Sequence, residues 1–287
     1  MKAGIIGLGL IGGSMARALK ASGAEILGYD TEMRTLQFAQ MLGCCDDVLT
    51  EKNMGECDCL FLAIPPHAAE DWLTEHAEKI GRQKNQPLIM DCCGVKRQIC
   101  ELGFRLEETE GIRFVSIHPM AGRETWGLRN SDKDLFNGAL CAIIPNKPDR
   151  NDPALMASVK KILQIAGFTR FTVMTPEEHD KVIALTSQLS HVVSSSFVKC
   201  DDGIREEAVT AGGSFRDMTR VAYLNEHIWS ELFLENRDNL LSRLDLFIGE
   251  LEKYRVALAS SDRNELTGLL AKGREEKEFL TSMAKRV

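Results

Sequence analysis

The chain has 287 residues, of which 44% are hydrophobic, so it can bury two modest cores or one large core with a helical extension. Charged residues make up 27% and the net charge is −7, so the overall field repels polyanions and we expect no nucleic acid as a partner. No apolar run approaches the roughly 18 residues that a membrane span needs, and no basic region precedes an apolar one at the N-terminus. We therefore expect a cytoplasmic protein with no membrane as a partner.

The first half of the chain alternates short apolar runs with helical stretches, which predicts a parallel β-sheet flanked by helices. The runs lack a clean alternation of polar and apolar residues, as expected for strands that helices cover on both faces. A further run, Thr169 to Met174, follows the helical stretch Pro153 to Ala166 and is expected to close the sheet at one edge. The other predicted strands are Lys2 to Ile6, Glu25 to Tyr29, Cys59 to Ile64, Pro87 to Asp91, Arg113 to Ile117 and Leu140 to Ile144.

The second half is expected to be all-α, because no proline follows Pro176 and the apolar spacing from Ile183 to Phe197 suits helices. We therefore predict an α/β fold. A Rossmann-type, doubly wound parallel sheet is expected over residues 1–174, and an all-α substrate-binding and dimerisation domain over residues 175–287. A helical domain of about 110 residues often completes its core against a second copy, so a homodimer through this domain is expected.

A glycine-rich turn follows the first predicted strand and opens a helical stretch. In this pattern the first glycine permits a tight turn, the second lets a pyrophosphate approach the backbone, and the third allows close packing of the helix on the sheet. The helix N-terminus then supplies unpaired amides. We expect Gly7, Gly9, Leu10, Ile11 and Gly12 to bind a dinucleotide; the alternative is that the glycines only form a turn.

Asp30 ends the second predicted strand, where a carboxylate can accept hydrogen bonds from the adenosine ribose hydroxyls. Because a 2′-phosphate there would meet like charge, the predicted cofactor is NAD. Arg34 lies one helical turn further on and is able to hold such a phosphate, so NADP stays open as the alternative. Ile64 and Pro65 follow the third strand at the carboxyl edge of the sheet and are expected to face the cofactor, unless they only form a rigid turn.

His118 is the candidate catalytic residue. It lies in the segment from Ser116 to Gly122, at the end of the fifth predicted strand, where the nicotinamide is expected to reach. An imidazole suits removal of a proton from a hydroxyl while hydride leaves the same carbon. A lone histidine is more often structural, but a position at the carboxyl end of a strand, followed by Pro and Gly, favours the catalytic interpretation.

The helical half offers candidates for holding a substrate. Arg216 and Arg220 are spaced by four residues, and arginine forks bind carboxylates well. The alternative is that these arginines pair with Asp217 or Glu226. His191 lies on an apolar helical face and, taken alone, is more often a core histidine. The remaining histidines are interpreted as surface or structural residues: His67, His76, His179 and His227.

These motifs resemble the prephenate dehydrogenase family, which includes the arogenate and cyclohexadienyl dehydrogenases of tyrosine biosynthesis. The likeness spans most of the chain, and its histidine and arginine motifs are more specific than the glycines. It rests on the glycine turn with Gly13-Ser14, on Asp91 to Lys96, on His118 to Gly122 with Glu124, on Leu135 to Gly138, on Ser187 to His191 and on Phe215 to Arg220.

The resemblance implies an NAD-dependent oxidative decarboxylation in which prephenate gives 4-hydroxyphenylpyruvate, carbon dioxide and NADH. It implies that His118 takes the proton of the ring hydroxyl, that Arg220 holds a substrate carboxylate and that His191 positions the substrate side chain. Aromatisation drives the loss of carbon dioxide, so no metal is needed. The nine cysteines also lack the two-residue spacings of zinc sites, which predicts free thiols.

Two positions depart from the family pattern. Gly94, in the segment Asp91 to Lys96 that is expected to face the cofactor, stands where many members carry a serine that contacts the substrate hydroxyl. Cys93, Ser116 or an ordered water are the candidates to replace that serine. The segment Gln188 to His191 stands where members often show His-Leu-Pro-His. The second histidine of that motif is retained as His191, but the residues before it differ.

Three rival interpretations stay open. Arogenate carries an amino group in place of the side-chain keto oxygen of prephenate, and Glu124 or Asp217 near that side chain would favour it. The β-hydroxyacid dehydrogenases share the fold but use a lysine of the helical half, for which Lys181 and Lys199 are available. Their mechanism has no place for His118. A non-enzymatic NAD sensor would bind the cofactor and tolerate replacement of this histidine.

Overall fold

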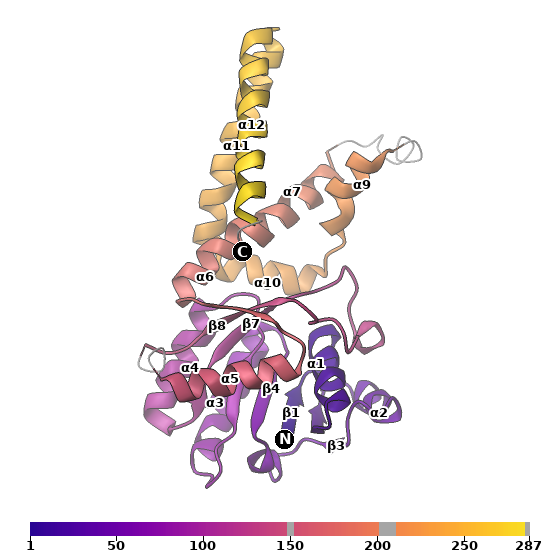
Figure 1. The fold of residues 1–287 in the computed structure, drawn as a ribbon, viewed down its shortest axis with the longest axis vertical. Helices are drawn as coiled ribbons and strands as arrows, with labels where there is room; N and C mark the ends of the chain where they lie inside the picture. Colours follow the sequence, from indigo (N-terminus) through magenta and orange to yellow (C-terminus); the bar gives the residue numbers. More distant parts are fainter. Residues whose placement is uncertain (148–151, 201–210, 285–287) are drawn as a thin grey trace. The chain divides into compact units, whose positions relative to one another are not determined.

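A computed structural model describes residues 1–147, 152–200 and 211–284 of the chain (Figure 1). Contacts divide the protein into two compact units, Met1–Arg237 and Asp238–Val287. The first unit opens with alternating strands and helices. In chain order these are β1 (Lys2–Ile6), α1 (Leu10–Ala21), β2 (Glu25–Tyr29), α2 (Met33–Met41), β3 (Asp47–Val48), a 3-10 helix (Met54–Glu56), β4 (Cys59–Leu62), α3 (Pro66–Gly81), β5 (Leu88–Asp91), α4 (Arg97–Glu110) and β6 (Arg113–Phe114).

The first six strands form the predicted doubly wound parallel sheet, in the order β3-β2-β1-β4-β5-β6. Helices cover both faces of this sheet (Figure 1). Successive side chains of a strand point to opposite faces, so Ile5 joins the core that contains α1 and Ile6 joins the core that contains α3. Burial of both faces explains why the strand sequences are continuously apolar rather than alternating.

A second sheet corrects the prediction that all strands belong to one parallel sheet. It contains β7 (Ser116–Met120), β8 (Leu140–Ile144) and β9 (Arg170–Val173), with β7 and β8 antiparallel and β8 and β9 parallel. The connections explain these directions. Between β7 and β8 there is only a short 3-10 helix (Leu128–Asn130), so the chain returns antiparallel, whereas α5 (Pro153–Ile165) provides the crossover that the parallel pair needs.

The rest of the first unit is helical, as predicted. A capping box starts the first of these helices, because Thr175 Oγ1 accepts from the N–H of Glu178 while Glu178 Oε2 accepts from the N–H of Thr175. A wide π-helical turn then joins two α-helices without a break, a feature often found at functional sites. The elements are α6 (Pro176–Ile183), the π-helical turn (Ala184–Gln188), α7 (Leu189–Phe197), α9 (Gly213–Thr219), a 3-10 turn (Arg220–Ala222) and α10 (Glu226–Glu235).

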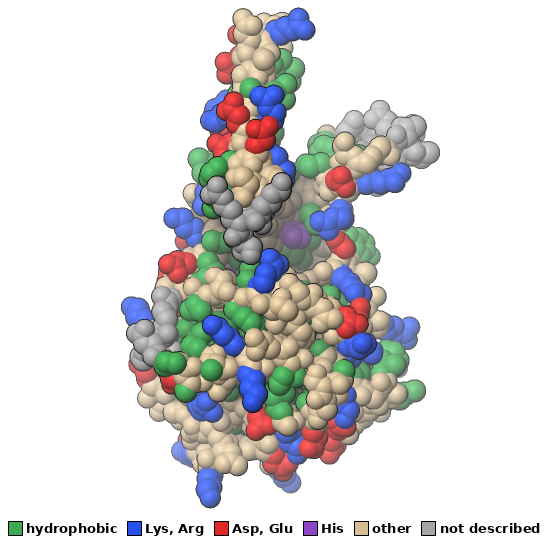
Figure 2. All heavy atoms as spheres, viewed as in Figure 1, with side chains coloured by type: hydrophobic (Ala, Val, Ile, Leu, Met, Phe, Trp, Pro, Cys, Tyr) green, Lys and Arg blue, Asp and Glu red, His purple; other side chains and the backbone are tan. Residues whose placement is uncertain are grey.

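The second unit is built from α11 (Arg237–Ala259), whose first residue still belongs to the first unit, and α12 (Arg263–Ala284). Side chains of both helices are visible in Figure 2, and large apolar ones are exposed on each. Exposed apolar surface of this kind is typical of an interface. No helix in the described ranges is long and apolar enough to cross a membrane. The domain boundary expected after residue 174 lies inside the first contact unit and stays a prediction.

Packing explains two of the three glycines in the turn between β1 and α1. Gly7 has φ +89°, in the left-handed region, and a Cβ on it would lie 2.5 Å from the carbonyl oxygen of Ala63. A Cβ on Gly12 would lie 1.8 Å from the carbonyl oxygen of Gly7. A Cβ on Gly9 would meet no atom within 4 Å. The fold therefore requires Gly7 and Gly12, whereas Gly9 borders open space.

Replacing Gly12 with alanine is expected to lower the free energy of unfolding by at least about 2 kcal/mol, because the new methyl group meets a backbone oxygen that cannot rotate away. Gly9→Ala is the matched control and is expected to change this free energy by less than about 0.5 kcal/mol. Urea unfolding followed by circular dichroism measures both values. Equal destabilisation by the two substitutions would contradict this account of the turn.

Candidate active site

The turn between β1 and α1 has the features expected of a dinucleotide site. Leu10 and Ile11 form the first turn of α1, where backbone N–H groups have no acceptor within the helix and are available to an anion. The open space at Gly9 adjoins this turn. The loop after β4, which contains Ile64 and Pro65, packs against the glycine turn. The Ile64 side chain lies 2.5 Å from the position that a Cβ on Gly7 would occupy.

Asp30 lies directly after β2, and its carboxylate is bound to the glycine turn. Oδ2 accepts a hydrogen bond from the N–H of Leu8 at 2.8 Å, and Oδ1 accepts one from the N–H of Glu32 at 2.9 Å. Each oxygen keeps a lone pair for a further donor. Arg34 is exposed near the start of α2 and lines a hollow together with Arg129. The predicted ribose-binding carboxylate is thus held beside the predicted phosphate-binding turn.

A cavity of about 540 Å³ in the first unit brings together most of the predicted substrate-site residues. This volume is within the usual range for a small-molecule site. His118 lines the cavity from β7, Gly94 from the loop after β5, His191 from α7 and Arg220 from the turn after α9. Arg216 does not line it. It is exposed on α9, and the change from α-helix to 3-10 turn at Arg220 prevents the two arginines from continuing along one α-helical face.

Arg220 forms an ion pair with Glu124, which also lines the cavity. The sequence had offered Asp217 or Glu226 as the partner of this arginine, so the observed partner is a different residue. A backbone hydrogen bond and the Arg220 guanidinium lower the pKa of Glu124. The guanidinium retains further N–H groups for a substrate carboxylate. The two exposed lysines of the rival mechanism, Lys181 and Lys199, are not among the residues that line the cavity.

His191 is held by its own helix and by an aromatic neighbour. Nδ1 lies 2.8 Å from the carbonyl oxygen of Ser187, and the ring stacks on Trp229 with 3.9 Å between centroids. Because a carbonyl only accepts, His191 donates from Nδ1. Burial lowers the pKa of His191, which favours the neutral ring with Nε2 as a hydrogen-bond acceptor.

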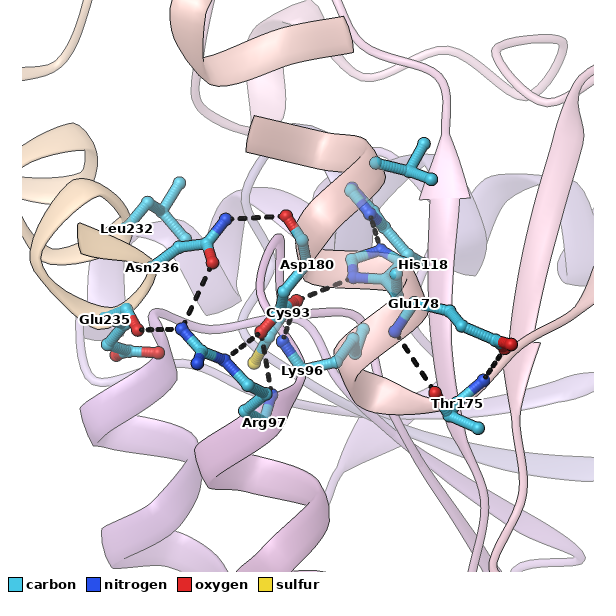
Figure 3. Close-up of polar contacts among 12 residues, drawn as sticks. Cys93, Lys96, Arg97, His118, Thr175, Glu178, Asp180, Leu232, Glu235 and Asn236 are labelled. Atoms are coloured by element: carbon cyan, nitrogen blue, oxygen red, sulfur yellow. Dashed lines mark hydrogen bonds and ion pairs between the residues drawn. The ribbon is translucent and has the colours of Figure 1, made fainter. Parts of the chain in front are cut away.

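His118 begins a chain of hydrogen bonds that leads into the core. It lies inside β7 rather than at the predicted strand end, since the strand continues to Met120. Its Nδ1 lies 2.8 Å from Nε2 of His179, and Nδ1 of His179 lies 2.8 Å from Oδ1 of Asp180 (Figure 3). His179 and Asp180 are both buried on α6. We call this arrangement the His118–His179–Asp180 chain.

The default assignment of His179 as a surface or structural residue missed this contact. The two histidines are 61 positions apart, and no local pattern relates them. The one available signal was the adjacency of His179 and Asp180 at the start of a predicted helix, where an acidic neighbour can fix the orientation of an imidazole.

Asp180 also accepts hydrogen bonds from the start of α4. Oδ1 accepts from the N–H of Lys96 at 2.8 Å, and Oδ2 accepts from the N–H of Arg97 at 3.0 Å and from its Nε at 3.4 Å (Figure 3). The two main-chain N–H groups are ones that a helix cannot satisfy within its own first turn. Asp180 therefore serves as an acceptor for α4 as well as for His179.

The acceptor role of Asp180 determines the proton positions along the chain. His179 must carry its proton on Nδ1, so its Nε2 is an acceptor. His118 must then donate from Nδ1, which leaves Nε2 without a proton. Burial, followed by the effects of His179 and Lys96, lowers the pKa of His118 well below its ordinary value and keeps the ring neutral. The nitrogen that His118 offers to the cavity is thus an unprotonated Nε2.

A buried ion pair supports β7 beside His118. Lys96 Nζ donates to Asp91 Oδ1 and to the carbonyl oxygen of Ile117, both at 2.6 Å, and neither charged side chain is exposed. The segment from Asp91 to Lys96 was expected to face the cofactor. Its two ends instead belong to the core, and within it Gly94 lines the cavity.

The space next to Gly94 is limited. A Cβ on this residue would lie 3.3 Å from Cδ2 of Leu232 on α10, so a side chain there requires Leu232 to move by a few tenths of an ångström. Cys93 and Ser116, two candidates to replace the family serine, are buried and do not line the cavity. Neither side chain therefore takes the place of that serine.

Two family models match the chain. One is described as the nucleotide-binding domain of prephenate dehydrogenase and matches residues 15–173; the other is described as the dimerization domain of prephenate dehydrogenase and matches residues 175–272. The prephenate dehydrogenase of Bacillus subtilis is 30% identical over 270 residues, covering 91% of this chain and 71% of that protein. The cyclohexadienyl dehydrogenase of Zymomonas mobilis is 32% identical over 276 residues, covering 91% and 90% of the two chains.

The chain is also similar to solved structures of dehydrogenases. The crystal structure of prephenate dehydrogenase from A. aeolicus in complex with hydroxyphenyl propionate and NAD+ matches with a TM-score of 0.80 and 27% identity, covering 98% of both chains. Synechocystis arogenate dehydrogenase, at 24% identity and a TM-score of 0.76, shares the fold. With both domain models matched and a relative at 32% identity aligned over nine-tenths of each chain, the protein belongs to the prephenate dehydrogenase family.

Proposed function

We propose that the protein oxidises and decarboxylates prephenate to 4-hydroxyphenylpyruvate, with hydride transfer to NAD, as a step of tyrosine biosynthesis. The observation that carries this proposal is the contact of His118 Nδ1 with His179, in a cavity that Arg220 also lines, because this contact leaves Nε2 of His118 as the acceptor. A base of this kind suits removal of the proton from a ring hydroxyl, and a guanidinium suits a dicarboxylate substrate. Curated relatives named prephenate dehydrogenase support it.

The glycine turn fits NAD. A pyrophosphate can occupy the open space at Gly9 beside the first-turn amides of α1, and the remaining lone pairs of Asp30 suit ribose hydroxyls. A 2′-phosphate would face this carboxylate, so we favour NAD over NADP despite the exposed Arg34 nearby in sequence. The relative from A. aeolicus was solved with NAD+. When bound, the nicotinamide accepts hydride from the ring carbon that carries the hydroxyl.

The residues of the cavity supply the rest of the chemistry. Nε2 of His118 takes the hydroxyl proton as the C–H bond breaks, and the C–O bond becomes a carbonyl. The ring carboxylate then leaves as carbon dioxide, and the electrons of the broken C–C bond make the ring aromatic while the oxygen recovers the proton from His118. Prephenate and NAD+ thereby give 4-hydroxyphenylpyruvate, carbon dioxide and NADH, with Arg220 holding a carboxylate throughout.

Arogenate is the second candidate substrate, and His191 favours it. With Nδ1 donating to Ser187, the neutral ring presents an acceptor, which suits the ammonium group of arogenate better than the keto oxygen of prephenate. Glu124 adds a negative charge to the same cavity. The relative from Z. mobilis is named cyclohexadienyl dehydrogenase. Turnover of both substrates would make this protein an enzyme of that kind.

We further propose a homodimer formed through the helical domain, with the domain boundary near residue 174. The dimerization-domain model begins at residue 175, and α11 and α12 expose large apolar side chains that a second copy would cover.

Replacing His118 with asparagine is expected to lower kcat for prephenate by about 10²- to 10⁴-fold, because an amide cannot take the hydroxyl proton. Arg220→Ala is expected to act mainly by raising KM, since the carboxylate is bound in both the ground and transition states. NADH formation measures both effects. His227→Asn, at an exposed histidine, is the matched control and should match the parent protein. Full turnover by the His118 variant would contradict the role assigned to His118. NAD binding without any prephenate oxidation by the parent protein would favour an NAD sensor.

The His118–His179–Asp180 chain predicts a specific pattern for His179. His179→Ala removes the acceptor for His118, so kcat should fall by about 10- to 100-fold with little change in KM. His179→Gln should retain more activity, because its amide can donate to Asp180 and accept from His118.

The pH dependence separates this positioning role from a structural one. The lowered pKa of His118 lets it act as a base at lower pH, so the acid limb of the kcat profile should lie below about pH 6.5 in the parent protein. In His179→Ala the limb should move upward, since one of the groups that lower this pKa is gone. Equal activities of the two His179 variants, with an unmoved acid limb, would contradict the assigned role.

A further inference from the structure

A cluster of one imidazole and three carboxylates lies between α3 and α10, apart from the residues that line the cavity. His67 and Glu70 are three positions apart on α3, and Glu231 and Glu235 are four apart on α10, so each pair shares a helical face. From Nδ1 of His67, the nearest oxygens of Glu70, Glu231 and Glu235 lie at 3.8, 4.0 and 3.7 Å. These separations are too long for hydrogen bonds, but Oε1 of Glu231 accepts one from the main-chain N–H of His67 at 2.6 Å.

The cluster contains buried oxygens without a donor. The Glu235 side chain is only 5% exposed, and its Oε1 has no hydrogen-bond partner. Oε1 of Glu70 is likewise buried and unpartnered. Among the described residues, no lysine or arginine forms an ion pair with either glutamate or with Glu231. Buried carboxylate oxygens without a donor are costly, and His67 is the one basic side chain in the described ranges that lies within ion-pair distance of these glutamates.

The donor types and spacing suit a transition-metal ion. Imidazole nitrogen and carboxylate oxygen bind Zn²⁺ at about 2.0–2.2 Å, which places two ligands of a tetrahedral ion roughly 3.3–3.5 Å apart. The separations from His67 exceed this by about half an ångström, and the ligand atoms of the three residues all lie within 4.8 Å of one another, so rotation of the side chains is enough to bring them together. His67 is 64% exposed and offers a path of entry from solvent. Magnesium, which prefers oxygen ligands alone, suits this donor set less well.

The geometry points to a divalent-metal site, of the Zn²⁺ class, formed by His67, Glu70 and Glu235. The site is separate from the proposed catalysis, which needs no metal. A bound ion would tie α3 to α10. The first of these helices begins directly after the loop of Ile64 and Pro65, and the second presents Leu232 to the cavity. The metal would therefore join the proposed cofactor side to the substrate side.

Another group of similar composition, Glu51, Glu75 and His76, provides the comparison. Glu51 is already bound by Lys79, and His76 Nδ1 already has the carbonyl oxygen of Trp72 as a partner. Its glutamates are exposed rather than buried. These differences make Glu75 a suitable control position, since a nonspecific surface contribution to metal binding would be lost there as readily as at Glu235.

Isothermal titration with Zn²⁺ alone tests the site. The parent protein should bind one Zn²⁺ ion at a site whose affinity falls at least about tenfold in Glu235→Gln and in His67→Ala, whereas Glu75→Gln should leave it unchanged. His67→Ala alters an exposed side chain, so it remains informative if the buried Glu235 variant folds poorly. Zn²⁺ should also raise the thermal midpoint of the parent protein and of Glu75→Gln, but not of His67→Ala.

Unchanged Zn²⁺ affinity in His67→Ala, or a loss at Glu75→Gln equal to that at Glu235→Gln, would overturn the proposal. The same holds if the parent protein binds no Zn²⁺. None of these three results would bear on prephenate turnover, because the titration contains no substrate or cofactor.

Discussion

The site depends on one buried charge, the carboxylate of Asp180. The residue is 1% exposed, and an ionised group at such a depth is tolerated only when donors surround it. Its oxygens accept from the backbone of Lys96 and Arg97 at the start of α4 and from His179 on its own helix. Its main-chain oxygen accepts from Nδ2 of Asn236, just after α10, at 2.8 Å. The carboxylate thereby connects α4 to α6, and the main chain of the same residue adds the end of α10, all behind the cavity.

This arrangement determines the chemical state of His118 in two ways. Asp180 fixes the proton of His179 on Nδ1, and His179 in turn fixes the proton of His118 on Nδ1, so the nitrogen left for the cavity is an acceptor. The same burial, together with the nearby cation of Lys96, disfavours protonation of His118. His118 therefore has the protonation state of a base before any substrate binds. Buried residues of the core, rather than residues that line the cavity, determine the orientation of its ring.

Sequence alone predicted the features that depend on neighbouring residues. The glycine turn, the position of Asp30 after the second strand and the parallel strands all follow from local patterns. The predicted fold class and the family were correct. Three features depend on distant contacts and were not predictable: the antiparallel return of β8, the absence of Arg216 from the cavity and the bond between His118 and His179. The last needs β7 and α6 to be placed side by side, which no periodicity encodes. The burial of Asp91 and Lys96 is of the same kind, because their spacing fits a loop and a core ion pair equally well.

Nitrogen-15 NMR of the histidine side chains in the intact protein measures the proton positions along the His118–His179–Asp180 chain directly. At neutral pH, we expect His118 and His179 both to carry their proton on Nδ1, and Nε2 of His118 to give the signal of an unprotonated ring nitrogen. Assignment follows from the loss of one set of signals in each single-histidine variant. A proton on Nε2 of His118, or a doubly protonated His118 ring, would contradict the account.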